Sequence, residues 1–331
     1  MTVPVEPAVA FGVLATTSWV ATDSVLPALV ASRRARLVHV ASRDPGAASE
    51  VAARFGAERS SGNYDAVLAD PDVEAVYVPL PNGLHREWAE RAAAAGKHVL
   101  CEKPLATSAA EAATMAGACE AAGVVLMEAY MTPFHPRAPA LLHVLRSGVL
   151  GEPRFARADF TFPLADPGNH RWRPEMGGGA LLDLGVYCLT PLVEVGGSLP
   201  EVVVARAVAA PSGVDATFTG WLAFPGRFAA TFACSFEAPE RQWLEIVGTE
   251  ATVSVEVPFA GGAAGTRAQL HHRDGRTEPL DGPDGDPYLG MVDHFAAVVR
   301  GRETLHRPPH ESIALLTLLD RLRSAATGVG G

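Results

Sequence analysis

The sequence predicts an α/β protein that begins with a doubly wound parallel sheet and continues into a second α/β domain with a large, open, mainly antiparallel sheet. Two patterns predict this class. Over residues 8–127 short β-rich runs alternate with Ala-rich amphipathic segments, which is typical of βαβ units. Over residues 201–270 short alternating runs follow one another without helices between them, which is typical of antiparallel strands. Because one hydrophobic core rarely grows beyond about 250–300 residues, we expect two domains, at residues 1–130 and 131–331.

The first half supplies strands and helices in alternation. Apolar and β-branched runs mark the strands, and Ala-rich amphipathic stretches mark the helices. Gly96 and Gly123 follow two of these helices, where glycine adopts a left-handed C-cap with least strain. The predicted strands are Val9–Leu14, Leu37–Ser42, Ala75–Val78, His98–Cys101 and Val124–Met127, and the predicted helices are Trp19–Ser32, Ala47–Phe55, Tyr64–Leu68, Leu84–Ala95 and Ser108–Ala121.

The second half opens with a predicted helix at Pro136–Ser147 and an extended segment at Pro153–Pro163. Alternation in the strands that follow leaves apolar side chains on an open sheet face, so we expect a homodimer or homotetramer packed through that sheet. The predicted strands are Val202–Val208, Ala216–Phe224, Phe228–Phe236, Trp243–Val247 and Ala251–Val257, and the predicted helices are Gly179–Val195, Tyr288–Val299 and Glu311–Ala325.

The composition argues against several classes of partner. The chain is 48% hydrophobic and 19% charged, with a net charge of −10 and no run of Lys and Arg, which speaks against nucleic acid. Residues 1–7 do not resemble a signal peptide, and no stretch approaches the ~20 apolar residues of a membrane span. We therefore expect a cytoplasmic protein with a small-molecule partner and no membrane partner.

The cysteines predict reduced core thiols, because they form no C-x-x-C pair and stand in apolar surroundings. No cluster of His, Asp and Glu has the spacing of metal ligands, so we expect no metal. The four cysteines are Cys101, Cys119, Cys188 and Cys234.

Three polar loops carry the residues that predict chemistry. Glu102-Lys103-Pro104 directly follows the strand predicted at His98–Cys101, so we expect an ammonium group at the carboxyl end of a parallel strand. Ligands bind at that end of open α/β sheets. A second loop lies at Pro79–His85, and a third lies far downstream at Gly177–Tyr187. We interpret the three loops as parts of one site.

These loops resemble those of a known family, the glucose-fructose oxidoreductase, inositol dehydrogenase and rhizopine-catabolism (Gfo/Idh/MocA) oxidoreductases. The resemblance is carried by Tyr77–His85, Gly96–Ala106 and Gly177–Tyr187, and it extends over nearly the whole chain. It implies a Rossmann domain followed by an α/β domain with an open antiparallel sheet. It also implies NAD(P) as the cofactor and a sugar or another polyol as the substrate, bound between the two domains.

The turn after the first predicted strand departs from the family pattern. Ala15, Thr17 and Val20 stand where the three glycines of the dinucleotide fingerprint would fall, and those glycines allow the backbone to approach the diphosphate. In one interpretation the turn still binds the diphosphate, through backbone N–H groups and hydroxyls at a helix N-terminus. In the other the chain has kept the fold and lost tight cofactor binding. The first interpretation assigns cofactor contacts to Ala15, Thr16, Thr17, Ser18 and Trp19.

The second predicted strand ends at Ser42 and Arg43, where the adenine ribose of the cofactor should lie. An acidic residue there would bind a 2′-hydroxyl, whereas an arginine suits a 2′-phosphate. We therefore expect NADP(H) as the preferred cofactor, NAD(H) as the second choice, and Ser42 and Arg43 as the selecting residues. The alternative is that Arg43 is only a solvated loop charge. The other predicted cofactor contacts are Pro79, Leu80, Asn82, His85, Glu102 and Lys103, of which Asn82 and His85 would lie beside the nicotinamide and Asn82 would also cap the following helix.

Hydride transfer at a carbinol carbon needs one group that exchanges the proton on oxygen and another that stabilises the developing alkoxide. By resemblance Lys103 faces the reacting oxygen, and an ammonium group near a phenol lowers the pKa of the phenol, so Lys103 and Tyr187 can share these roles. Asp183, the third predicted catalytic residue, precedes Tyr187 by four residues and would share the helix face that looks into the cleft. The alternatives are a loop lysine, a core tyrosine and a surface acid. We also hypothesise a cis peptide bond between Lys103 and Pro104.

Substrate contacts are expected from His170, Arg171, Trp172 and Tyr187, because a polar and aromatic segment precedes a Gly-rich helix start that permits close approach of the backbone. The rival interpretation of this segment is a flexible surface loop. The sequence thus predicts an NADP-dependent oxidoreductase acting on a carbinol or ketone carbon of a sugar, a cyclic polyol or a dihydrodiol. The alternatives are a nucleotide-deoxysugar 3-ketoreductase of secondary metabolism and a non-catalytic family member.

Overall fold

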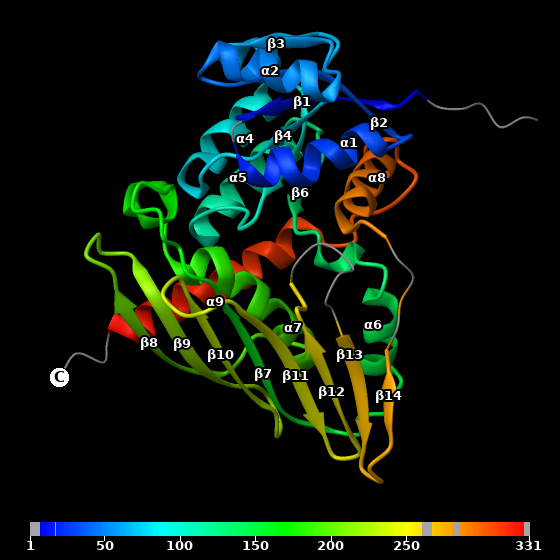
Figure 1. The fold of residues 1–331 in the computed structure, drawn as a ribbon, viewed down its shortest axis with the longest axis vertical. Coiled ribbons are helices and arrows are strands. Elements are labelled where there is room, and N and C mark those ends of the chain that lie inside the picture. The colour runs from blue at the N-terminus through cyan, green and yellow to red at the C-terminus, as the bar shows by residue number, and fades with distance from the viewer. Residues whose placement is uncertain (1–6, 17, 260–266, 281, 283–284, 328–331) are drawn as a thin grey trace, which may run out of the picture. The chain divides into compact units, whose positions relative to one another are not determined.

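The computed structural model describes the chain except for residues 1–6, 17, 260–266, 281, 283–284 and 328–331. The chain divides into two compact units (Figure 1). The first contains Met1–Ala106, Ala110–Met131 and Asp286–Ser312, and the second contains Thr107–Ala109, Thr132–Gly285 and Ile313–Gly331.

Residues 286–312 belong to the first unit although they follow the strands of the second in sequence. From the sequence we expected this segment within the domain at 131–331. Two contacts hold it in the first unit. Phe295 packs against Phe11 with 5.7 Å between ring centroids, and Arg300 forms an ion pair with Glu74 at 2.8 Å. The Arg300 guanidinium holds the pKa of Glu74 below its usual value.

The first unit is built on a six-stranded parallel sheet with the order β3-β2-β1-β4-β5-β6. The order turns at β1, which pairs with β2 on one side and β4 on the other, so the switch point of a doubly wound sheet lies beside β1. The predicted parallel sheet is confirmed, and only the short edge strand β3 was not predicted. The strands are β1 (Val9–Leu14), β2 (Ala35–Ala41), β3 (Arg59–Ser61), β4 (Ala75–Val78), β5 (His98–Glu102) and β6 (Leu126–Ala129).

The helices around this sheet begin and end at recognisable signals. Asp44 caps α2 by accepting the Gly46 N–H at 2.8 Å, Pro45 occupies the first helical position, and Gly56 ends the helix with a φ of 73°. The stretch predicted as one helix at 19–32 contains a π-helical turn before α1. The helical elements are η1 (π, Ala21–Val25), α1 (Leu26–Ala31), α2 (Pro45–Phe55), α3 (Asp65–Ala69), η2 (3₁₀, Asn82–Leu84), α4 (His85–Ala94), α5 (Ala109–Ala121) and α8 (Pro287–Val299).

The second unit is built on an eight-stranded sheet with the order β14-β13-β12-β11-β7-β10-β9-β8. All neighbours pair antiparallel except β7 and β10, which are parallel, so the predicted mainly antiparallel sheet is confirmed. The strands β13 and β14 were not predicted. The strands are β7 (Pro153–Thr161), β8 (Val202–Ala209), β9 (Asp215–Ala223), β10 (Ala229–Ser235), β11 (Arg241–Gly248), β12 (Ala251–Glu256), β13 (Arg267–His272) and β14 (Thr277–Pro279).

One face of this second sheet is covered by α7, which packs on β7 and β10. Leu189 of α7 is fully buried, and Phe218 stacks on Phe232 beneath the helix layer with 6.1 Å between ring centroids. Helical residues 174–196 are long and apolar enough to cross a membrane by composition, but two thirds of that window is buried inside the protein, as expected of a core helix. The helical elements are η3 (Thr132–Phe134), α6 (Ala138–Arg146), η4 (His170–Trp172), η5 (Pro174–Met176), η6 (π, Leu181–Gly185), α7 (Val186–Gly196) and α9 (Pro309–Thr327).

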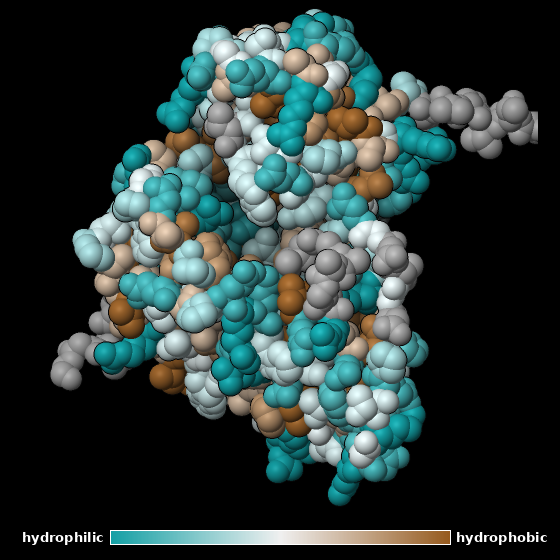
Figure 2. Space-filling view, in the orientation of Figure 1, coloured by the Kyte–Doolittle hydropathy of each residue, from teal (hydrophilic) through white to brown (hydrophobic). Residues whose placement is uncertain are grey.

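The molecular face in Figure 2 is mostly hydrophilic, and its hydrophobic residues lie as separate spots.

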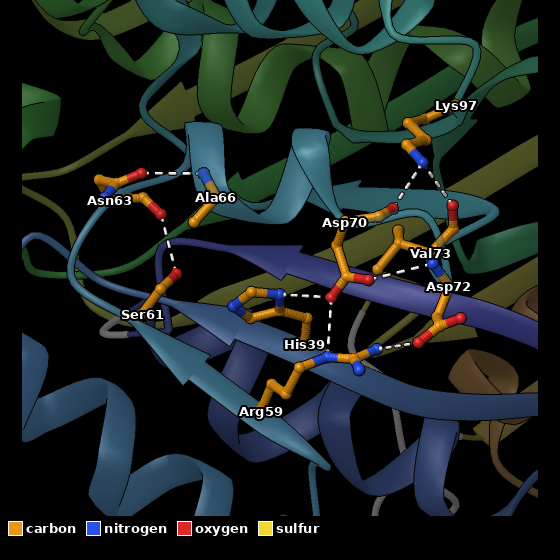
Figure 3. A network of polar contacts seen from close by, with 9 residues as sticks. All are labelled: His39, Arg59, Ser61, Asn63, Ala66, Asp70, Asp72, Val73 and Lys97. Atoms are coloured by element: carbon orange, nitrogen blue, oxygen red, sulfur yellow. Dashed lines mark hydrogen bonds and ion pairs between the residues drawn. The ribbon is translucent and has the colours of Figure 1, made fainter.

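A buried polar network inside the first unit connects β2 to the segments before β4 and β5 (Figure 3). At its centre, Asp70 Oδ2 lies 2.8 Å from both His39 Nδ1 and Arg59 Nε, while its Oδ1 accepts the Asp72 N–H at 3.0 Å. Burial alone would raise the pKa of Asp70, but Asp72, His39 and Arg59 together hold it below its usual value.

Lys97 completes this network from the turn before β5. Its ammonium donates to the main-chain carbonyls of Asp70 at 2.8 Å and Val73 at 2.7 Å. Burial lowers the pKa of Lys97, and the nearby Asp70 carboxylate opposes that shift. The network lies at the amino ends of β4 and β5, the edge opposite the one where ligands bind in open α/β sheets, so we interpret it as structural.

Candidate active site

The Lys103 loop begins directly after a buried carboxylate at the end of β5. Glu102 is the last residue of β5, and its Oε1 accepts the Tyr77 hydroxyl at 2.6 Å while its Oε2 accepts the Lys103 N–H at 3.2 Å. Burial raises the pKa of Glu102, and the hydrogen bond from Tyr77 opposes that shift. The Lys103–Pro104 peptide bond is cis, which confirms the hypothesis drawn from the sequence.

A second carboxylate, Glu128 on β6, fixes the backbone just beyond Pro104. Its Oε1 accepts the Leu105 N–H at 2.9 Å, its Oε2 accepts the Ser312 hydroxyl at 2.7 Å, and Arg307 lies 3.7 Å away. Sequence reasoning missed Glu128. The available signal was an acidic residue inside the apolar run that forms β6, because a buried acid needs partners.

The loop after β4 contains the 3₁₀ turn η2. Asn82 begins this turn, and α4 begins at His85 with Leu84 at its N-cap, so the predicted position of Asn82 at the N-cap is wrong. The reason is local: the 3₁₀ turn inserts three residues between Pro81 and the helix. The His85 imidazole is fully buried, with Nε2 2.7 Å from the Leu80 carbonyl oxygen and Nδ1 2.9 Å from that of Pro104.

The turn after β1 keeps the shape of a glycine turn without glycine. Ala15 has a φ of 66°, in the left-handed region where a residue with a Cβ costs about 1 kcal/mol or more. The Thr16 hydroxyl is buried and has no hydrogen-bond partner among the described residues. Helix begins at Trp19, which is 71% exposed, next to Ser18; the predicted contact Thr17 lies outside the described residues. The left-handed conformation of Ala15 and the unsatisfied Thr16 hydroxyl are the two described features that fit a bound diphosphate.

The residues directly after β2, Ser42 and Arg43, present a hydroxyl and a guanidinium, and Tyr64 contacts the guanidinium. Ser42 is buried, and its hydroxyl accepts the Asp44 N–H at 3.2 Å, while Arg43 is exposed. Burial raises the pKa of Tyr64, and a hydrogen bond with Arg43 opposes that shift. The Tyr64 ring stands edge-on against Trp88 at 5.0 Å, which gives the arginine a fixed partner. A hydroxyl and a guanidinium are groups that suit a 2′-phosphate.

In the second unit the predicted catalytic residues Asp183 and Tyr187 lie on a helix that starts with a π turn. Asp183 belongs to η6 and Tyr187 to α7, and both side chains are buried. The Tyr187 ring packs against Phe160 at 5.5 Å and Phe259 at 5.9 Å. Asp183 Oδ2 accepts the Arg171 Nε–H at 2.7 Å, so the structure brings the predicted substrate segment and the predicted loop at residues 177–187 together.

The segment 169–173 packs against the start of that helix, where the backbone approaches closely at Gly178. A Cβ at Gly178 would clash with the Arg171 carbonyl oxygen, which accepts the Gly179 N–H at 3.0 Å. His170 opens the 3₁₀ turn η4, and the Trp172 ring packs edge-on against Phe236 at 5.3 Å. Within this unit Arg171 is therefore held by Asp183 and Trp172 by Phe236, while the role of these residues in substrate binding stays a prediction.

Sequence reasoning also missed Asp215, which caps this helix from β9. Its Oδ2 accepts the Leu181 N–H at 2.6 Å. Burial raises the pKa of Asp215, and the Leu181 N–H opposes that shift. No local signal could have found it, because it lies 34 residues away within an ordinary strand pattern. Among the residues that the structure describes, no group of three or more His, Cys, Asp or Glu side chains could hold a metal ion.

Two family models match the chain. Residues 16–130 match the oxidoreductase family with an NAD-binding Rossmann fold, and residues 140–254 match the GFO/IDH/MocA C-terminal domain. D-xylose 1-dehydrogenase (NADP(+)) 2 from Haloferax volcanii is 35% identical over 96% of this chain and 98% of its own. The dTDP-3,4-didehydro-2,6-dideoxy-alpha-D-glucose 3-reductase of Saccharopolyspora spinosa is 36% identical and is matched over 88% of both chains.

Solved structures give the same assignment. Aldose-aldose oxidoreductase from Caulobacter crescentus, complexed with glycerol, superposes with a TM-score of 0.89 at 26% identity, over 97% of this chain and 98% of that one. The 3-ketoreductase KijD10 from Actinomadura kijaniata, in complex with NADP and TDP-benzene, has a TM-score of 0.88 at 30% identity over 96% and 98% of the two chains. The fold, the loops and these similarities agree, and the chain belongs to the Gfo/Idh/MocA family of oxidoreductases.

Proposed function

We propose that this protein is an NADP(H)-dependent oxidoreductase that moves a hydride between the nicotinamide and a carbinol or ketone carbon of a sugar, a cyclic polyol or a dihydrodiol. One observation carries the proposal. Lys103 follows β5 at the carboxyl edge of a parallel sheet, and the backbone on both sides of Pro104 is held by the buried carboxylates of Glu102 and Glu128. Relatives named as a xylose dehydrogenase and a dihydrodiol dehydrogenase support the substrate class.

When bound, the nicotinamide cofactor accepts or supplies the hydride, so the residues of the chain must handle the proton and the charge on oxygen. We assign proton exchange to the Tyr187 hydroxyl and stabilisation of the developing alkoxide to the Lys103 ammonium. Asp183 is assigned a positioning role, since it holds the Arg171 guanidinium. The whole sequence contains two lysines, Lys97 and Lys103, and the ammonium of Lys97 donates to the main-chain carbonyls of Asp70 and Val73.

The cofactor preference is tested by calorimetric titration of the nucleotide-free protein with NADPH and NADH. The unchanged protein is expected to bind NADPH more tightly, because Arg43 meets the 2′-phosphate with a charge-assisted hydrogen bond. Arg43→Ala is expected to weaken NADPH binding by about 10- to 100-fold and to leave NADH binding within about threefold. Arg54→Ala, which removes an exposed charge from α2, is the matched control. Equal losses for both nucleotides, or no loss, would remove the selector role from Arg43.

A second candidate function is reduction of a nucleotide-linked deoxysugar at its 3-keto group. The ordered Arg171, held by Asp183 next to His170, favours it because a diphosphate on the substrate needs a fixed cation. The relative from Saccharopolyspora spinosa supports it as well. Assays with NADPH and a dTDP-linked 3-ketosugar, and with NADP⁺ and free pentoses, hexoses or a dihydrodiol, separate the two. Turnover of only the nucleotide-linked substrate would replace the first function by the second.

We also propose that the protein is a cytoplasmic homodimer or homotetramer. All four cysteines are free and buried, which suits a reducing compartment.

The oligomeric state is argued from an exposed apolar face. The strand register places Val202, Val204, Trp221 and Phe155 on one face of the second sheet, and each is between 42% and 53% exposed. Burying such a face favours association. Light scattering is expected to give a mass of at least twice the 34.7 kDa chain, and Trp221→Glu is expected to reduce it; a monomer at micromolar concentration would contradict this surface.

A further inference from the structure

His85 joins two loops of the first unit that are otherwise separate in sequence. It is the first residue of α4, and its side chain has no solvent exposure. Nε2 lies 2.7 Å from the carbonyl oxygen of Leu80, in the loop after β4, and Nδ1 lies 2.9 Å from that of Pro104, directly after Lys103. A fully buried imidazole cannot touch a cofactor without moving, so the predicted contact with the nicotinamide does not explain its position.

We infer that His85 is a positioning residue that fastens the Lys103 loop to the loop after β4, and that the number of its ring protons decides whether one loop or both are fastened. Carbonyl oxygens only accept hydrogen bonds, so each contact needs an N–H on the ring nitrogen that faces it. A neutral imidazole has one N–H and can satisfy Leu80 or Pro104, according to its tautomer. An imidazolium has two and satisfies both.

The charge environment decides which state is present. Burial lowers the pKa of His85, while the carbonyls of Leu80, Pro104 and Leu105 and the carboxylate of Glu128 oppose that shift. The ring is therefore neutral at pH 7 and takes up its second proton as the pH falls below the ordinary histidine value of about 6.5. The other ionisable groups of the surrounding elements are Tyr77 on β4, His98, Cys101 and Glu102 on β5, Lys103 after it, Arg307 beside Glu128, and Arg86, Glu87, Glu90 and Arg91 on α4.

His85 connects two segments of the first unit that are both predicted to lie at the cofactor. The segment 79–82 is the predicted nicotinamide contact, and Lys103 is the predicted group at the reacting oxygen. When both carbonyls are held, the two segments keep a fixed spacing before the cofactor arrives, so less order has to be gained on binding. Loss of the ring N–H groups is expected to weaken nucleotide binding and to free the backbone next to Lys103.

The test compares His85→Phe, which keeps an aromatic ring and removes both donors, with His85→Gln, which keeps one donor. His98→Gln is the matched control, because His98 is a half-buried histidine at the other end of β5 whose Nδ1 accepts the Val125 N–H at 2.9 Å. NADP⁺ affinity is measured by calorimetry between pH 5.5 and 8. We expect His85→Phe to bind about tenfold more weakly than the unchanged protein once the His85 ring of the latter carries its second proton, and to lose less at pH 8, with His85→Gln between them and His98→Gln unchanged.

Two further measurements use nucleotide-free protein. In ¹⁵N spectra of the unchanged protein recorded from pH 8 downward, the His85 ring is expected to carry one N–H at pH 8 and to gain the second only below the ordinary histidine value of about 6.5. Hydrogen exchange of the Leu105 amide is expected to be about tenfold faster in His85→Phe, even though Glu128 still accepts that N–H. Affinity and exchange equal to those of the unchanged protein, or a pH-independent loss with no second ring proton, would overturn the inference.

The inference rests on the proposed function only in the roles given to Lys103 and the segment 79–82. If no substrate is turned over, the function fails while the ring protons and the exchange of Leu105 still decide the role of His85. If the enzyme is active and the His85 variants bind and exchange like the unchanged protein, only the role of His85 fails. Thermal unfolding checks each variant, and one that does not fold leaves the decision to the spectra of the unchanged protein.

Discussion

Lys103→Met is expected to bind NADPH as tightly as the unchanged protein and to lose at least about 100-fold of its kcat, the loss typical when one stabilising donor at a developing oxyanion is removed. Methionine keeps the length of the side chain and removes the charge and the protons. Lys103→Arg is expected to lose less, because it restores the positive charge, but not to recover full activity, because a planar guanidinium does not reproduce the compact ammonium. The measurements are calorimetric NADPH affinity and single-turnover rates with the best substrate.

Arg86→Met is the control for this prediction, since Arg86 lies on the exposed part of α4 and pairs only with Glu90 among the described contacts. Its kcat and KM are expected to stay within about twofold of the unchanged protein. A kcat near normal in Lys103→Met would remove Lys103 from the mechanism. A loss confined to KM would mean that Lys103 binds substrate equally in the ground state and the transition state.

Asp70→Ala is expected to lower the free energy of unfolding by about 3 kcal/mol, the largest effect on stability that we predict. The substitution leaves the buried His39 ring and the Asp72 N–H without their acceptor, and a buried donor without a partner costs about 1–3 kcal/mol. It also removes the ion pair with Arg59. Lys97 keeps its two main-chain acceptors, so the effect belongs to the carboxylate. The measurement is urea unfolding followed by circular dichroism.

The matched control is Asp72→Ala, which removes only the exposed ion pair with Arg59 at 3.0 Å and is expected to cost less than about 1 kcal/mol. The two variants should also differ in their pH dependence. Because the folded pKa of Asp70 is lowered, its carboxylate stabilises the protein above the unfolded value of about 3.9 and loses that effect as the pH falls through the folded value. Asp70→Asn should therefore flatten the stability curve below about pH 4. If Asp70→Ala lowers the free energy of unfolding no more than Asp72→Ala does, Asp70 is not the main stabilising residue of the network.

The residues that could be predicted are those whose signal is local. The Lys103 loop was predicted because an apolar run and three polar residues stand next to each other in the sequence. The departure at Ala15 was also visible, but only the structure gives its φ of 66°, the left-handed conformation that glycine adopts with least strain. Glu128 and Asp215 escaped prediction because each acts on a backbone N–H at a distance in sequence, 23 residues for Glu128 and 34 for Asp215.

By itself the sequence determined the order of helices and strands, the parallel and antiparallel character of the two sheets, the family, and the loops that carry the chemistry. These follow from the spacing of apolar side chains over a few residues, since burial of one face dictates the period. Only the tertiary structure decided that residues 286–312 complete the first unit, that Asp183 holds Arg171, and that His85 faces two carbonyls. Buried polar groups must find partners, and which segment supplies the partner depends on packing between parts of the chain that no local pattern relates.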